Sequence, residues 1–79
     1  MSRYTVTNLR AVIDDANGKY PLDEPNGYGN FNRFNIYKAY GKYCIVEQRP
    51  HSTGHREITH HGSAREVAAE FTEYLIENF

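Results

Sequence analysis

The chain has 79 residues, 39% of them hydrophobic, and a formal net charge of −1. A single domain covering residues 1–79 is expected, because domains usually span on the order of 100–200 residues. So short a chain uses most of its apolar side chains for its own core and has few left for a deep pocket. We therefore do not expect an enzyme.

The distribution of apolar residues and cysteine indicates a cytoplasmic protein. Residues 1–5 lack the apolar run of a signal peptide, and no stretch approaches the ~18 apolar residues of a membrane helix. The single cysteine, Cys44, has no partner for an internal disulfide, so the fold does not require an oxidising compartment. We expect no membrane partner.

The first regular element expected is a helix over residues 8–17. Leu9, Val12, Ile13 and Ala16 follow the spacing of one helix face, with Thr7 as a possible cap and Gly18 as a stop. An alternative stays open, because the run from residue 4 to residue 7 is rich in strand-favouring side chains.

Residues 19–32 are expected to form a long loop. This span contains two prolines, two glycines and three asparagines, which resist regular structure. Long loops in small domains are usually functional or disordered.

Three strand-like runs follow, over residues 33–40, 43–49 and 55–61. Gly41 and Lys42 suit a two-residue hairpin turn, which would pair Tyr40 with Tyr43 and Ile36 with Glu47, with a one-residue slip as the alternative. The third run is polar around Ile58.

The last element expected is a helix over residues 64–78. Ser63 and Glu66 fit a capping box, in which each side chain takes a backbone N–H at the helix start. An apolar stripe on one face follows, at Ala64, Val67, Ala68, Phe71 and Leu75.

These elements predict an α+β fold with the order α-β-β-β-α. Both helices would cover one face of a three-stranded antiparallel sheet, because each has one apolar stripe to bury. The other face would be partly open and would carry tyrosines and basic residues.

No catalytic, metal or cofactor site is predicted. His51, His55, His60 and His61 are close in sequence, but their spacing fits no zinc motif. Adjacent residues on a strand point to opposite faces, so His60 and His61 would not share an ion. Cys44 lies in an apolar strand-like run, which is typical of a buried core cysteine.

The aromatic and basic middle of the chain predicts a binding surface. Residues 33–62 carry five basic and two acidic side chains, and the preceding loop is rich in Tyr, Gly and Asn, which binding loops favour. The residues expected to contact a partner are Tyr28, Phe31, Arg33, Tyr37, Lys38 and Tyr40.

A second, acidic surface is expected on the last helix. Glu66, Glu70, Glu73 and Glu77 follow helical spacing, which places successive carboxylates about 5–6 Å apart. A solvated outer face is the alternative to a contact surface for a basic partner.

The order of elements resembles the double-stranded RNA-binding domain, and residues 62–66 are similar to the glycine-serine start of that domain's last helix. That family carries a lysine cluster there, whereas this chain has Arg65 followed by Glu66. Binding to an RNA duplex is therefore not predicted. A small nucleic-acid-binding accessory protein remains the alternative function, because aromatic residues stack bases and basic residues track phosphates.

In size and in its meander followed by a capped helix, over residues 34–78, the chain also resembles small phage-encoded inhibitors, anti-CRISPR proteins in particular. The resemblance implies a stoichiometric protein that blocks a nucleic-acid-targeting defence complex in the host cytoplasm by surface complementarity. The leading hypothesis is therefore a protein-binding module of this inhibitory kind.

Overall fold

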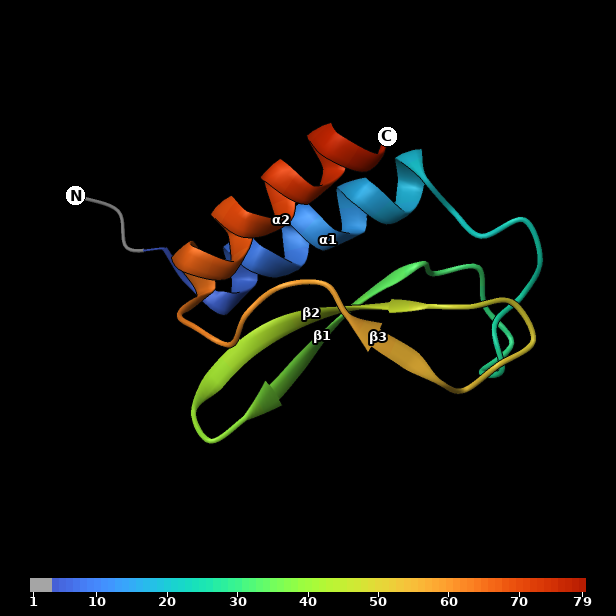
Figure 1. The fold of residues 1–79 in the computed structure, drawn as a ribbon, viewed down its shortest axis with the longest axis horizontal. Coiled ribbons are helices and arrows are strands. Elements are labelled where there is room, and N and C mark those ends of the chain that lie inside the picture. The colour runs from blue at the N-terminus through green and yellow to red at the C-terminus, as the bar shows by residue number, and fades with distance from the viewer. Residues whose placement is uncertain (1–3) are drawn as a thin grey trace.

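The computed structural model describes residues 4–79. Met1, Ser2 and Arg3, part of the segment expected not to be a signal peptide, lie outside the described residues. The elements are α1 (Val6–Lys19), β1 (Phe34–Ala39), β2 (Lys42–Gln48), β3 (His55–Glu57) and α2 (Ala64–Asn78). They form an α+β fold in the predicted α-β-β-β-α order (Figure 1).

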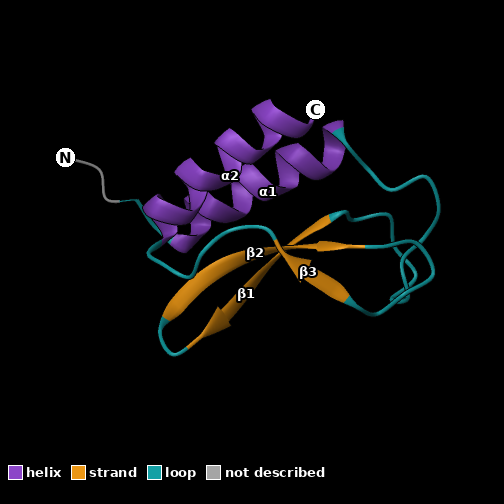
Figure 2. Ribbon diagram, in the orientation of Figure 1, coloured by secondary structure: helices purple, strands orange, loops and turns teal. Residues whose placement is uncertain are grey.

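The two helices lie side by side over one face of the sheet (Figure 2). The sheet is antiparallel, with strand order β1-β2-β3. No helix among the described residues has the length and apolar character needed to cross a membrane.

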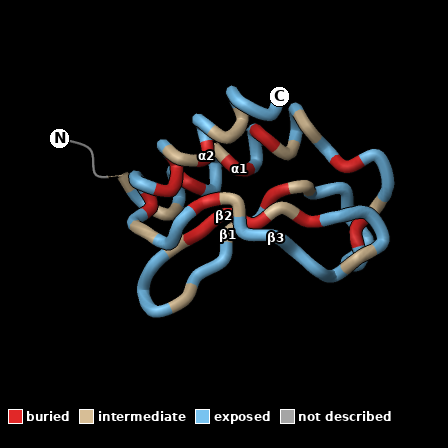
Figure 3. The backbone as a smooth tube through the Cα atoms, viewed as in Figure 1, coloured by how far each residue is buried: buried red, intermediate tan, exposed pale blue. Residues whose placement is uncertain are grey.

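The core lies between the helix layer and the sheet, where Figure 3 shows buried segments facing one another. The predicted stripes provide it: Leu9, Ile13 and Ala16 are buried on α1, and Val67 and Phe71 on α2. From the sheet come Phe34 and Ile45, and the Phe34 ring packs edge-on against Phe71 with centroids 4.9 Å apart. Helix periodicity therefore predicted the core-facing sides of both helices.

Helix α1 is longer at both ends than the predicted range 8–17. It begins at Val6 after Thr5, whose backbone N–H donates to the side-chain Oδ1 of Asn8 over 2.9 Å, so Thr7 is not the cap. Gly18 lies inside the helix and does not stop it. The helix continues because the Tyr20 N–H still bonds to the Ala16 carbonyl, while the Tyr20 ring stacks on Phe79 at 4.5 Å.

The β1–β2 hairpin turns one residue earlier than the predicted Gly41-Lys42. Ala39 pairs with Lys42 and Ile36 with Ile45, so Tyr40 and Gly41 occupy the two turn positions. Both have positive φ, 54° and 74°, as a type I′ turn requires. This turn type matches the twist of the strands, but it places the backbone of Tyr40 in the left-handed region, which is unfavourable for residues other than glycine.

Strand β3 ends at Glu57, well before the predicted residue 61. The N–H of Ile45, which would continue the ladder, donates instead to the hydroxyl of Thr59 over 3.0 Å. The Ile58 N–H still donates to the Ile45 carbonyl over 2.9 Å, and the next backbone pair is Tyr43 with Gly62, which exchange N–H···O bonds of 2.8 and 2.9 Å. Residues 59–61 therefore bulge out of the ladder.

Candidate functional site

The sheet has two edge strands, β1 and β3, and the outward backbone groups of β1 are only partly occupied. The Gln48 N–H donates to the Arg33 carbonyl, which sets the alternation of backbone hydrogen bonds along β1. The backbone N–H and C=O groups of Tyr37 therefore point toward β2. Those of Phe34, Ile36 and Lys38 point away from it. The Ile36 N–H donates to the Asn35 side chain. Within residues 4–79, the Lys38 N–H and the Ile36 and Lys38 carbonyls have no intramolecular hydrogen bond.

Two grooves flank this edge. One, of about 310 Å³, lies between α1 and β1, and its polar rim includes Arg10, Asp14 and Lys38. The other, of about 330 Å³, lies on the face of the sheet away from the helices and is lined by two tyrosines, three asparagines and other polar side chains: Tyr28, Asn30, Asn32, Asn35, Tyr37, Gln48 and His55 among them. The edge of β1 thus runs between two grooves.

Four of the residues predicted to bind a partner lie around this edge. Tyr28 and Tyr37 line the groove on the open face, and Lys38 lines the groove beside α1. Tyr40 occupies the hairpin tip with its side chain fully exposed. Tyr37 and Lys38 point to opposite faces of the sheet, so they cannot form one flat surface.

The other two predicted residues lie apart from these grooves. Phe31 is exposed, and its carbonyl accepts a hydrogen bond from the Leu22 N–H. The Arg33 guanidinium donates to the carbonyls of Tyr20 and Pro21 over 2.8 and 3.1 Å. It also lies 3.6 Å from the Glu47 carboxylate and over the Phe79 ring. Arg33 therefore joins the loop to the sheet and the C-terminus.

Only part of the predicted acidic stripe remains without an internal partner. Glu66 completes the capping box with Ser63, as predicted, through bonds of 3.2 and 3.3 Å. Glu70 accepts bonds from both the backbone N–H and the ring Nδ1 of His60. Glu73 and Glu77 are in no ion pair among the described residues.

The groove on the open face depends on Asn26, a buried residue that the sequence did not single out. Its side-chain amide donates to Asn30, to the Asn32 carbonyl and to Gln48, the last over 2.6 Å. Its Oδ1 accepts from the backbone N–H of Tyr28. This single side chain shapes the loop and orients Tyr28.

Gly27 lets the same loop approach the segment after β2. Its N–H donates to the Ser52 carbonyl over 2.7 Å. A Cβ at this position would lie 2.6 Å from the carbonyl carbon of Ser52 and 2.7 Å from Thr53, so only glycine fits. The loop is thereby fixed against the groove rim.

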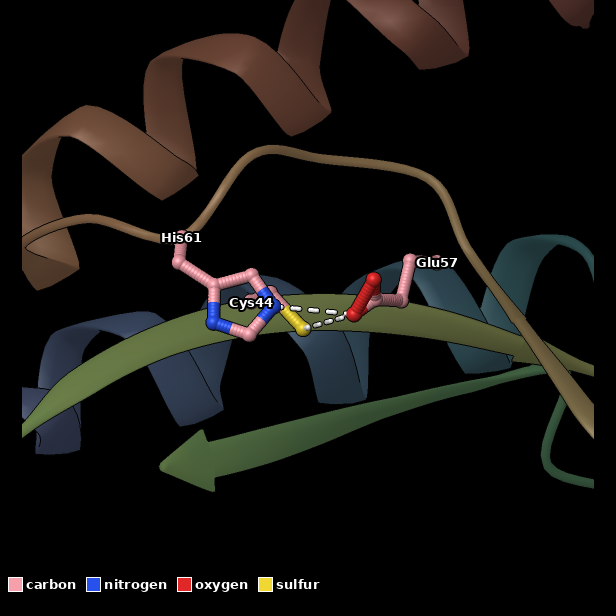
Figure 4. Close-up of side chains that lie close together, drawn as sticks. All are labelled: Cys44, Glu57 and His61. Atoms are coloured by element: carbon pink, nitrogen blue, oxygen red, sulfur yellow. Dashed lines mark hydrogen bonds and ion pairs between the residues drawn. The ribbon is translucent and has the colours of Figure 1, made fainter. Parts of the chain in front are cut away.

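A separate cluster of side chains joins Cys44, Glu57 and His61 (Figure 4). Cys44 lies on the sheet face away from the helices and is fully buried. Its Sγ is 3.9 Å from Glu57 Oε2, and the same oxygen is 2.8 Å from His61 Nε2. The carboxylate oxygen therefore contacts both the thiol and the imidazole, and the three ligand atoms lie within 4.8 Å of one another.

This arrangement does not suit nucleophilic catalysis. An activated thiol needs a neighbour that stabilises the thiolate, whereas Cys44 Sγ lies 3.9 Å from the Glu57 carboxylate, whose negative charge disfavours it. Burial and then the charge and hydrogen bond of Glu57 raise the pKa of the Cys44 thiol. The hydrogen bond from His61 lowers the pKa of Glu57. The thiol is thus held in its protonated, unreactive form.

The remaining histidines do not join this cluster. His60 contacts Glu70, and His51 lies 2.6 Å from the Glu24 carboxylate. His55 packs near the Tyr37 ring. The sequence did not predict the contact between Cys44, Glu57 and His61, because it depends on the bulge after β3.

Comparisons with protein-family models, with curated proteins and with solved structures give no match to this chain. The candidate sites therefore rest on its own geometry.

Proposed function

We propose that this chain is a small non-enzymatic protein-binding module that receives an extended segment of its partner along the free edge of β1. The observation that carries the proposal is the set of unpaired backbone groups at Ile36 and Lys38 between two grooves. An extended peptide that adds to a sheet edge gains backbone hydrogen bonds from such groups.

The two grooves supply the selectivity that backbone bonds alone lack. Side chains of an added strand alternate between the two faces of the sheet. One set would enter the groove beside α1 and the other would contact Tyr28 and Tyr37. Pockets for alternate side chains are the usual source of specificity in strand addition.

Charge favours a partner segment with an acidic side chain on the α1 side. Arg10, Lys38 and the carboxylate of Asp14 line that groove, which leaves an excess of positive charge, and none of the three is in an ion pair among residues 4–79. A second copy of this chain fits less well, because antiparallel pairing of two β1 edges would bring one positively charged edge against another. The proposed occupant is therefore a segment of a different protein.

Tyr40 extends the surface beyond the end of β1. Its side chain is fully exposed, and its backbone is in the left-handed region, with φ 54°. Such a conformation costs an ordinary L-residue about 1–2 kcal/mol. Strained exposed residues concentrate at functional sites, which supports a role for Tyr40 in partner contact.

The proposal extends to a phage or mobile-element inhibitor of a host nucleic-acid-targeting complex, acting in the host cytoplasm. This extension is supported by the small size of the chain and by its meander followed by a capped helix. In such an inhibitor, the β1 edge would capture an extended segment of the defence complex.

A proline at position 38 tests the edge directly. The Lys38 N–H points away from β2, so Lys38→Pro removes an outward donor and leaves the β1–β2 ladder intact. Lys38→Ala is the matched control, since it removes the ammonium and keeps the N–H. The probe is a linear peptide selected on the wild-type chain from a displayed random library.

We expect Lys38→Pro to weaken peptide affinity by about tenfold or more, and Lys38→Ala to weaken it less. Bound peptide should slow hydrogen exchange at the Lys38 amide and leave the already paired Tyr37 amide unchanged. Equal binding by the proline variant, with circular dichroism showing a folded chain, contradicts the proposal. Steep loss of affinity with salt for single-stranded nucleic acid, without peptide binding, would support the nucleic-acid alternative instead.

A further inference from the structure

We propose that Cys44, Glu57 and His61 form a binding site for a zinc ion on the sheet face away from the helices. The ligand atoms of these three side chains lie within 4.8 Å of one another. They form the one such group of three in the described part of the chain. The site is separate from the β1 edge, so it does not depend on the proposed function.

The backbone brings the three ligands together from two strands and the bulge that follows them. Cys44 lies in the middle of β2, and Glu57 is the last residue of β3. His61 is held by its neighbour Gly62, which exchanges two backbone hydrogen bonds with Tyr43, next to Cys44. Figure 4 shows the sulfur, the carboxylate and the imidazole pointing toward one another.

The spacing is close to that of a tetrahedral zinc site. With Zn–S of about 2.3 Å and Zn–N and Zn–O of about 2.0–2.2 Å, ligand atoms lie roughly 3.3–3.6 Å apart. Here Sγ is 3.9 Å and Nε2 is 2.8 Å from Glu57 Oε2. The side chains of Glu57 and His61 are partly exposed and are therefore free to rotate toward an ion.

The ligand types select zinc over the harder cations. Thiolate and imidazole ligands favour zinc, whereas magnesium and calcium prefer sites made of oxygen atoms. Binding releases the thiol proton to solvent, and a thiolate, a carboxylate and a neutral imidazole together balance the charge of Zn²⁺. Three protein ligands leave the fourth tetrahedral position for water.

Cobalt(II) serves as the spectroscopic probe for the proposed site. We would titrate the reduced full chain, without a histidine tag, with Co²⁺ and then displace the Co²⁺ with Zn²⁺. One Co²⁺ per chain is expected, with the intense visible bands of tetrahedral cobalt and a thiolate-to-cobalt charge-transfer band. Addition of Zn²⁺ should abolish both signals and raise the melting temperature.

Adjacent histidines provide a matched pair of variants. His61→Gln removes a proposed ligand, whereas His60→Gln changes the next residue, which contacts Glu70 instead. We expect His61→Gln and Glu57→Gln to weaken Co²⁺ affinity more than about tenfold. Cys44→Ser should abolish the charge-transfer band, and His60→Gln should bind as the wild type does.

Absence of the charge-transfer band in the folded wild type would overturn the proposal. An equal loss of affinity in His60→Gln and His61→Gln would also overturn it, because the ion would then be bound elsewhere. Circular dichroism of each variant separates loss of a ligand from loss of the fold. The exposed position of His61 keeps the test usable even if Cys44→Ser unfolds.

Discussion

The side-chain amide of Asn17, near the end of α1, holds both backbone groups of Phe34 at the start of β1. Asn17 Nδ2 donates to the Phe34 carbonyl over 3.0 Å, and the Phe34 N–H donates to Asn17 Oδ1 over 2.8 Å. The Asn17 amide thus makes the two backbone hydrogen bonds that a neighbouring strand would otherwise make with Phe34. It fastens the first helix to the sheet and closes one end of the free edge.

Asn17→Ala is expected to lower the free energy of unfolding by about 1–3 kcal/mol. The variant leaves two backbone groups without their partner, and the better helix propensity of alanine offsets only part of the loss. Urea denaturation measures the change. Asn78→Ala, which removes one exposed bond to the Tyr74 carbonyl, is the control and should change stability by less than about 0.5 kcal/mol. Equal effects would mean that Asn17 does not hold the edge.

Tyr40→Asn is expected to stabilise the fold by about 0.5–1 kcal/mol and to weaken partner binding. Asparagine followed by glycine is the preferred sequence of a type I′ turn, so the substitution removes the backbone strain of a tyrosine with positive φ. Thermal melting and peptide affinity would be measured on the same samples. Tyr40→Phe retains the ring and should leave the melting temperature unchanged. A stabilised variant with full affinity would remove Tyr40 from the binding surface.

Arg33→Ala is expected to destabilise the fold by about 1–3 kcal/mol, because it removes two charge-assisted bonds to the carbonyls of Tyr20 and Pro21. Tyr28→Ala, at an exposed side chain with one weak bond to Thr53, should cost less than about 1 kcal/mol and reduce peptide affinity. Denaturation curves of the two variants, run side by side, check this difference. If Arg33→Ala leaves stability unchanged and weakens binding, Arg33 belongs to the partner surface after all.

The capping box should make stability depend on pH in the acidic range. Hydrogen bonds from Ser63 lower the pKa of Glu66 in the folded state. The ionised Glu66 side chain therefore contributes fully to stability above the pKa that glutamate has in the unfolded chain. That contribution is lost as pH falls through the lowered pKa of the folded state. The advantage of the wild type over Glu66→Gln should therefore shrink on acidification. Denaturation across a pH series measures this difference, and Glu73→Gln, at a carboxylate in no ion pair among the described residues, is the control for the change in net charge.

The helices and the layer order were predictable because their signals are local. The apolar stripes of α1 and α2 follow helical spacing, and the capping box at Ser63 is contained in four residues. The hairpin turn was displaced by one residue, because glycine alone suggested where positive φ would fall. The one-residue slip stayed open as an alternative, but no local signal indicated that Tyr40 would take the first position of positive φ.

The candidate sites depend on contacts between distant residues and were only partly predictable. Aromatic and basic composition identified Tyr28, Tyr37 and Lys38, which line the grooves. Composition also selected Arg33, whose guanidinium is used within the fold. Asn17 and Asn26 carry no local signal that distinguishes them from other loop or helix asparagines. Their roles arise from partners 17 and 22 residues away.

The short free edge of β1 also bears on how the protein behaves at high concentration. An exposed strand edge is a template for aggregation, and long flat edges favour open-ended fibrils. Here Asn17 blocks one end, the hairpin turn limits the other, and the positive charge of Lys38 lies between them. The remaining part of the β1 edge can pair with one short strand, but it is too short to favour an open-ended stack of strands.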